Sequence, residues 1–298
     1  MPARIWALAA ALAIALCAPA AAHPLTDAPR CPIFPADNPW NQRVDRLPVA
    51  SDSDRIVAAI GADEPLHPDF GTRYGIPFTT VGADQARVPV RFEYTGESDP
   101  GPYPIPPDVP LEEGSDRHAI VVDRDRCRLY ELFAARRLDG GARWEAGSGA
   151  IWNLRSNRLR PRGWTSADAA GLPILPGLAR YDDVRRGSID HALRFTVRQT
   201  RRAFVFPARH YASSLTDPSL PPMGMRFRLK RSFDVSGYPR QARIVLKALK
   251  RYGMLVADNG SDWFVTGAPS PHWDDGQLNT LKRVRGADFE VVDTRRPR

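Results

Sequence analysis

Prolines and glycines are the feature that most constrains the first part of this chain. Across residues 31–114 they recur together with aspartate, as in the run PADNP at 35–39. Such residues punctuate turns and extended segments and interrupt helices, and proline suits the edge of a sheet better than its centre. Between these turns we expect strands at 75–81 and 87–94. Apolar residues with helical spacing predict one short helix at 54–60.

A β-hairpin is the clearest element farther along the chain. The residues at 118–123 alternate between two faces, a turn follows at 124–126, and a second strand returns at 127–132. Apolar residues with helical spacing predict helices at 239–252 and 275–284. The other predicted strands are 150–154, 192–197, 203–206, 226–229, 254–257 and 262–266, the last two joined as a hairpin by the Asn-Gly turn in Asp258-Asn259-Gly260.

Many short strands with few helices favour a mainly-β fold. The specific prediction is a β-sandwich or jelly-roll-like single domain with two or three added helices. We expect three parts: a signal peptide at 1–22, a proline-rich N-terminal strap at 23–115 packed on the core, and a β-sandwich core with C-terminal helices at 116–298.

Residues 1–22 have the composition of a secretory signal. Arg4 supplies the positive charge, an apolar run follows at 5–16, and three alanines precede the cleavage point. The run is too short to cross a bilayer, and Leu16 disfavours a lipid anchor on Cys17. We expect a secreted or periplasmic protein with no membrane span.

Removal of the signal peptide leaves two cysteines, Cys31 and Cys127. An exported chain meets an oxidising compartment, so one disulfide between them is the prediction. The alternative is two buried free cysteines that never meet. Two cysteines are too few for a structural zinc site of their own.

The formal net charge of +8 comes mostly from arginine. The arginines are spread along the chain with acidic residues among them, and no nucleic-acid recognition motif accompanies them. We therefore interpret the charge as a solvated surface and expect no nucleic-acid partner. An acidic polymer as substrate is the alternative that the charge leaves open.

Six segments together resemble a family of secreted bacterial proteins found alone or alongside carbohydrate-active modules. They are SDRHAIVVDRDRCRLYELF, GWTSADAAGLPILPGLARYDDV, IDHALRFTV, PARHYASS, PPMGMRFRLK and KRYGMLVADNGSDWF. The resemblance covers nearly the whole chain after the signal peptide. It implies export and a single compact domain, and it assigns no catalytic residue.

Several well-known enzyme classes are excluded by their motifs. The segment HAIVVDRDRCRLYEL resembles the first hairpin of an L,D-transpeptidase, but that mechanism needs a later catalytic cysteine, and none follows Cys127. The E-x-D-x-x-E strand of many retaining glucanases is absent from the sequence. The G-x-S-x-G and H-E-x-x-H motifs are absent as well.

The stretch 116–211 concentrates the residues suited to chemistry. Carboxylates and histidines move protons in glycoside hydrolysis, and tryptophan rings stack on sugar faces. The candidate catalytic residues are Asp190, His191, Asp168, His118, His210 and Glu131, and the candidate substrate-binding residues are Trp144, Trp152, Trp164 and Glu145. For each the alternative is structural: a carboxylate paired with arginine, a hydrogen-bonded core histidine or a core tryptophan.

The three candidate histidines share the parity of apolar neighbours on their predicted strands, so all three side chains are expected to point inward. If they converge, they form either a polar catalytic pocket or a three-histidine metal site. The alternative is that each is satisfied separately by a hydrogen bond. We predict no bound metal and no cofactor.

These residues predict a secreted carbohydrate-active protein, specifically a glycan hydrolase that uses carboxylates with histidine support. Its expected partner is an extracellular polysaccharide or cell-wall glycan, on which it acts as a monomer. The alternative is a non-catalytic glycan or cell-wall binding protein that uses the tryptophans without paired acids.

Overall fold

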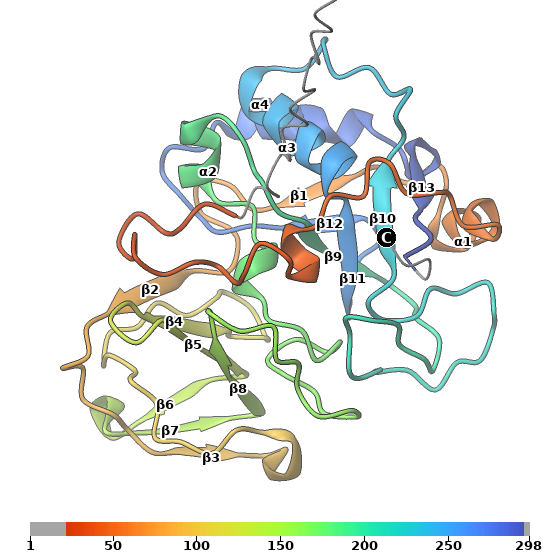
Figure 1. Cartoon of the computed structure of the whole chain (residues 1–298). Helices are drawn as coiled ribbons and strands as arrows, with labels where there is room; N and C mark the ends of the chain where they lie inside the picture. The colour runs from red at the N-terminus through yellow and green to blue at the C-terminus, as the bar shows by residue number, and fades with distance from the viewer. Residues whose placement is uncertain (1–21, 295–298) are drawn as a thin grey trace, which may run out of the picture.

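Three mixed β-sheets and a few short helices make up the protein in a computed structural model that describes residues 22–294 (Figure 1). The mainly-β class is therefore confirmed. The predicted signal peptide lies outside the described residues, except for Ala22. Within the described part of the chain, no helix combines the length and apolar character needed to cross a membrane.

The largest sheet has six strands and lies in the upper right of Figure 1. From one edge of the sheet to the other, the first pair of neighbouring strands is parallel, the second is antiparallel and the third is parallel. The last two pairs are antiparallel. The strands lie in the order β1 (His67–Asp69), β12 (Phe264–Thr266), β9 (Leu193–Val197), β11 (Met254–Asn259), β10 (Arg226–Leu229) and β13 (Phe289–Val291).

Three of the four α-helices gather over one face of this sheet in Figure 1. They are α2 (Tyr181–Arg186), α3 (Arg240–Arg251) and α4 (Asp275–Asn279), and α3 packs against β10, α4 and α2. The fourth helix, α1 (Ser53–Ile60), packs beside β13. Short 3-10 helices occur at Pro39–Asn41, Thr95–Glu97, Asp139–Gly141, Leu175–Gly177, Thr280–Arg283 and Gly286–Asp288.

The two smaller sheets lie together in the lower left of Figure 1. One has the order β2 (Phe78–Val81), β4 (Ala119–Asp123), β5 (Arg128–Phe133) and β8 (Ser148–Asn153); the other has the order β3 (Val90–Phe92), β7 (Arg143–Ala146) and β6 (Arg136–Leu138). The predicted first hairpin is β4–β5, with Val121 opposite Tyr130. Both side chains belong to an apolar cluster that also contains Trp144 and Ala146 from β7, so this cluster joins the two smaller sheets.

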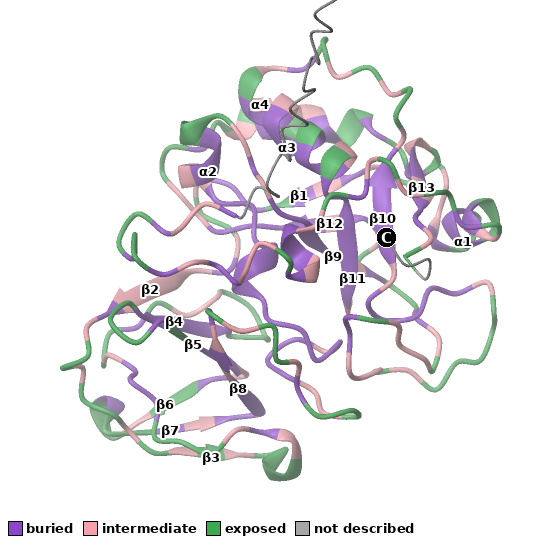
Figure 2. Cartoon of the chain, viewed as in Figure 1, coloured by how far each residue is buried: buried purple, intermediate pink, exposed green. Residues whose placement is uncertain are grey.

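The core of the six-stranded sheet is built around Trp263. Its ring stacks on Phe195 at 5.7 Å and on Phe289 at 5.2 Å between ring centroids. All three side chains are buried. The neighbouring strands β9, β10 and β11 are drawn almost entirely as buried in Figure 2. Gly286 is required beside the three rings, because a Cβ atom there would lie 2.8 Å from the indole nitrogen of Trp263.

The predicted disulfide is confirmed. Cys31 and Cys127 are joined, with 5.2 Å between their Cα atoms. Cys31 lies in the N-terminal segment and Cys127 lies in the turn between β4 and β5. The bond therefore fixes the N-terminal segment to the first hairpin. The segment 23–115 also contributes one strand, β1, β2 or β3, to each of the three sheets.

Two strand predictions are wrong. The strands predicted around Asp258-Asn259-Gly260 do not form a hairpin, because β9 lies between β11 and β12 and pairs with both. The Gly260 N–H bonds to the carbonyl of Val197 on β9. The segment 203–206 forms only a single bridge, between Phe204 and Met223.

Candidate functional site

A tightly held loop at 165–172 is the framework of the candidate site. On one side the Ser148 hydroxyl, at the start of β8, donates to the carbonyl of Ser166 at 2.6 Å. Within the loop, the Asp168 N–H donates to the Ser166 hydroxyl at 2.9 Å. Gly171 has a φ of +67°, and a Cβ atom there would lie 2.5 Å from the carbonyl of Trp164. These hydrogen bonds and the close approach at Gly171 restrict the conformation of the loop.

Two of the predicted histidines bond to the same loop, at the residues that precede and follow Asp168. His118 donates from Nε2 to the carbonyl of Ala167 at 2.9 Å, and His210 donates from Nδ1 to the carbonyl of Ala169 at 2.8 Å. The other nitrogen of His118 contacts the carboxylate of Glu112. Burial disfavours the charged ring, yet Glu112 more than offsets this and raises the pKa of His118.

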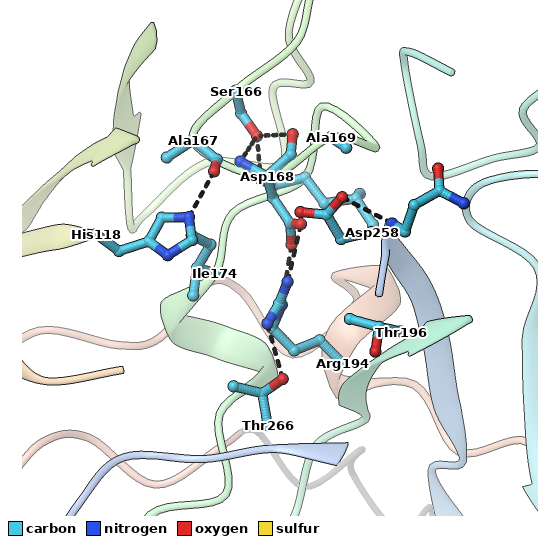
Figure 3. A network of polar contacts seen from close by, with 12 residues as sticks. His118, Ser166, Ala167, Asp168, Ala169, Ile174, Arg194, Thr196, Asp258 and Thr266 are labelled. Atoms are coloured by element: carbon cyan, nitrogen blue, oxygen red, sulfur yellow. Dashed lines mark hydrogen bonds and ion pairs between the residues drawn. The ribbon is translucent and has the colours of Figure 1, made fainter. Parts of the chain in front are cut away.

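Asp168, at the centre of the loop, forms a buried two-point ion pair with Arg194 on β9 (Figure 3). The guanidinium donates from Nε to Oδ2 and from Nη2 to Oδ1, both at 3.0 Å. The remaining Nη1 donates to the Thr266 hydroxyl on β12 at 2.7 Å. Asp168 is 1 % exposed and Arg194 is 4 % exposed. Such a fork orients the carboxylate as well as neutralising it.

Asp258 reaches the same place from β11 because of a β-bulge. Leu255 pairs with Arg194 and Val256 with Phe195, but Asp258 pairs with Thr196, which leaves Ala257 as the extra residue. Paired residues project to the same face of a sheet. Asp258 therefore shares the face of Arg194 and Thr196, whereas an unbulged strand would place it opposite Val197 on the other face.

The environment of Asp258 favours its protonated form. Burial, and after it the neighbouring charge of Asp168, raises the pKa of Asp258 to about 7, although Arg194 opposes the shift. Asp168 itself is held by Arg194. The two carboxylates interact, but only one of them has the guanidinium as a direct partner.

Both carboxylates line a pocket of about 440 Å³, which we call the carboxylate pocket. Exposed Tyr94 and half-buried His210 belong to its lining. Its full lining is Tyr94, Glu97, Asp116, Phe133, Ser148, Thr165, Ser166, Ala167, Asp168, Ala169, His210, Ala212, Asp258 and Asn259. Among the described residues, no lysine or arginine lines it. The pocket thus suits an uncharged or positively charged ligand with many hydroxyl groups.

Two candidates, Asp190 and His191, do not belong to this site. His191 is fully buried and faces the carbonyl of Ala192 and the carboxylate of Asp183, which is also paired with Arg180. Burial and Arg180 lower the pKa of His191. Asp190 contacts His23 at 3.2 Å. The three histidines therefore do not converge.

The remaining carboxylate candidates have structural contacts. Glu131 is fully buried, and it accepts hydrogen bonds from the N–H groups of Ile174 and Leu175 and from the indole of Trp152. Burial raises the pKa of Glu131 to about 7, although these donors oppose the shift. Glu145 on β7 forms ion pairs with Arg91 on β3 and Arg136 on β6, the two strands that flank β7 in the three-stranded sheet.

The three candidate tryptophans lie in two different places, one in the core and two at a pocket. Trp144 is 1 % exposed in the core between the smaller sheets, so it is not available to stack on a ligand. Trp152 and Trp164 line a second pocket next to the first. Among residues 22–294, no three His, Cys, Asp or Glu side chains are grouped to hold a metal ion.

Sequence reasoning missed three members of the network: Glu112, Arg194 and Asp258. Asp258 was assigned to a turn because Asn-Gly follows it. A carboxylate directly after the buried run at 254–257 was the available signal. Arg194 offered a similar one, as a charge inside the apolar strand at 193–197.

Comparison of the chain with protein-family models, with curated proteins and with solved structures finds no match.

Proposed function

We propose that this protein is a secreted glycan hydrolase that works in the carboxylate pocket, with Asp258 as proton donor and Asp168 as the second carboxylate. The observation that carries the proposal is the unequal pair: Asp168 is held by Arg194, while the pKa of Asp258 is raised to about 7. Two neighbouring acids in environments that separate their proton affinities are typical of acid–base catalysis.

The reaction that fits is hydrolysis of a glycosidic bond. Asp258 gives its proton to the glycosidic oxygen as the bond to the sugar breaks, so the leaving sugar departs as an alcohol. Asp168 stabilises the positive charge on the ring and directs water to it; the water supplies the hydroxyl to the ring and its proton returns to the carboxylate pair. Arg194 keeps Asp168 oriented throughout.

In this proposal the histidines support catalysis by positioning the loop that carries Asp168. His118 and His210 hold the carbonyls on either side of Asp168, and neither needs to touch the scissile bond. The aromatic rings of Tyr94 and Phe133 in the pocket lining supply apolar faces for a sugar ring. Export is supported by the Cys31–Cys127 disulfide, because such bonds persist in oxidising compartments.

The test is an activity screen of the mature protein on bacterial and plant polysaccharides, with reducing-end release as the readout. Asp258→Asn should lower turnover by about 100-fold or more, as loss of a general acid does. Asp168→Asn should do the same, with its fold checked by circular dichroism because it leaves Arg194 buried without a counter-ion.

Asp190→Asn is the matched control, since Asp190 contacts Ser188 and His23 and does not line the pocket. It should keep wild-type turnover. Glycan binding without any cleavage, unchanged in Asp258→Asn, would instead establish the non-catalytic glycan-binding alternative.

A further inference from the structure

A second pocket of about 500 Å³ adjoins the carboxylate pocket. Its lining is Asp99, Arg128, Ile151, Trp152, Asn153, Ser156, Arg158, Leu159, Arg160, Pro161 and Trp164. We call it the arginine pocket, because three arginines face one carboxylate in this lining. It plays no part in the acid–base chemistry described above.

Arg160 lines the arginine pocket and is hydrogen-bonded to two residues of the carboxylate pocket. Its guanidinium donates from Nε to the carbonyl of Thr165 and from Nη2 to the carbonyl of Glu97, each at 2.6 Å, and both of these residues line the carboxylate pocket. Its Nη1 pairs with Asp99 at 2.5 Å. The charge of Arg160 is therefore already matched, and its position is fixed.

The same guanidinium lies near two tryptophan rings. Its Cζ is 5.7 Å from the ring centroid of Trp152 and 5.5 Å from that of Trp164. Trp152 is buried and Trp164 is half-buried, so part of an indole surface remains open to the pocket. An aromatic surface next to a rigid polar wall is suited to stacking against a sugar ring.

Arg128 and Arg158 differ from Arg160, because their charges are unmatched. Both side chains are exposed, and within residues 22–294 neither guanidinium has an ion pair or a hydrogen bond. Arg128 comes from the start of β5 and Arg158 from the loop after β8, so the two reach the pocket from different segments. Arginine binds carboxylates with two parallel hydrogen bonds.

The neighbouring pocket has the opposite charge. Glu97, Asp116, Asp168 and Asp258 line it, and a ligand carboxylate there would meet four protein carboxyl groups. A polymer that spans both pockets must therefore present an acidic unit to one and an uncharged unit to the other.

We infer that the substrate is a heteropolysaccharide in which uronic acid units alternate with uncharged sugars, and that Arg128 and Arg158 bind the uronate carboxylate beside the uncharged unit held at Asp168 and Asp258. This inference rests on the proposed hydrolase function for its substrate chain. The binding step itself needs no catalysis and can be measured alone.

The experiment is calorimetric titration of the full mature chain carrying Asp258→Asn, so that bound oligosaccharides are not cleaved. The probes are three hexasaccharides: glucuronate alternating with N-acetylglucosamine, chitin hexasaccharide without any acid, and galacturonate hexasaccharide with an acid on every unit. The alternating probe should bind best, and adding Arg128→Gln and Arg158→Gln should weaken its binding by about tenfold or more.

The control pair Arg73→Gln and Arg231→Gln makes the same change in net charge at exposed arginines outside the arginine pocket. It should leave the affinity unchanged. Equal binding of the chitin probe, equal binding of the galacturonate probe, or an undiminished affinity in the Arg128/Arg158 variant would each overturn the inference.

Turnover by the wild-type chain separates this inference from the function on which it rests. Arginine-dependent binding of the alternating probe without any cleavage would reject the hydrolase and retain the arginine pocket as a uronate site. Cleavage of neutral glycans with no arginine-dependent binding would do the reverse.

Discussion

Asp258 faces the carboxylate pocket because of one extra residue in β11, and this makes the site hard to read from sequence. The pattern around Asp168, His118 and His210 was local, and the sequence placed all three in one candidate region. Asp258 depends on the register between β9 and β11, which is a contact between distant segments. Arg194 depends on the same pairing. A single sequence carries no local signal for such a register.

The raised pKa of Asp258 predicts how activity depends on pH. As a proton donor, Asp258 is active in its protonated form, and the protonated fraction falls as pH rises through about 7. Turnover should therefore decline by about tenfold per pH unit on the alkaline side of that value. Initial rates measured between pH 5 and 9 on a cleaved glycan test this.

The residual turnover of Asp258→Asn should lack the decline, because the titrating group is gone. Asp190→Asn should keep it. An alkaline limb that persists in Asp258→Asn would assign the proton donor to another residue.

At the level of strands and helices, local sequence patterns predicted the position of an element well where its own residues carry a clear apolar periodicity or turn. The hairpin β4–β5, the strand β10 and the helix α3 lie close to their predicted positions. The short elements α2, β6, β7 and β13 were missed, since several are rich in arginine and have little apolar periodicity. The predicted hairpin at 254–266 failed because the order of strands in a sheet is set by distant partners.

Glu131 links two such elements, β5 and the 3-10 helix at 175–177, and should make stability depend on pH. In the folded protein burial raises its pKa from 4.5 to about 7. Between these values the unfolded chain has lost the proton that the folded chain keeps. The folded state then binds more protons, so the free energy of unfolding falls as pH rises through this window.

Glu131→Gln removes this titration whatever its effect on absolute stability. At about 1.4 kcal/mol per pKa unit, the contribution of Glu131 across the window is about 3 kcal/mol. Urea unfolding at several pH values should show a flatter slope between pH 5 and 7 in Glu131→Gln than in the wild type. Glu113→Gln, at an exposed glutamate, should keep the wild-type slope. Identical slopes in all three proteins would contradict the assignment.

At the scale of the whole molecule, the Cys31–Cys127 disulfide links two distant parts of the described chain. It joins residues 96 positions apart. In the chain-entropy model a loop of this length stabilises the folded state by about 4–5 kcal/mol, and removal of native disulfides costs about 2–5 kcal/mol. This pairing was predictable because the expected mature chain contains only two cysteines.

Cys31→Ala with Cys127→Ala should therefore lower the melting temperature, and reductant should lower that of the wild type to a similar value. Reductant should have no effect on the double variant, which serves as its own control. Thermal unfolding followed by circular dichroism provides the measurement. A wild-type melting temperature that reductant leaves unchanged would show that the bond contributes little.

The parallel pairing of β1 with β12 has a consequence for the order in which the chain assembles during synthesis. All strands of the two smaller sheets lie before residue 154, so these sheets can pair as soon as that length has emerged. His67, by contrast, pairs with Phe264, and β13 begins only at Phe289. Closing so long a loop is entropically costly and slows folding. We therefore expect the six-stranded sheet, and with it the Arg194–Asp258 side of the pocket, to form last.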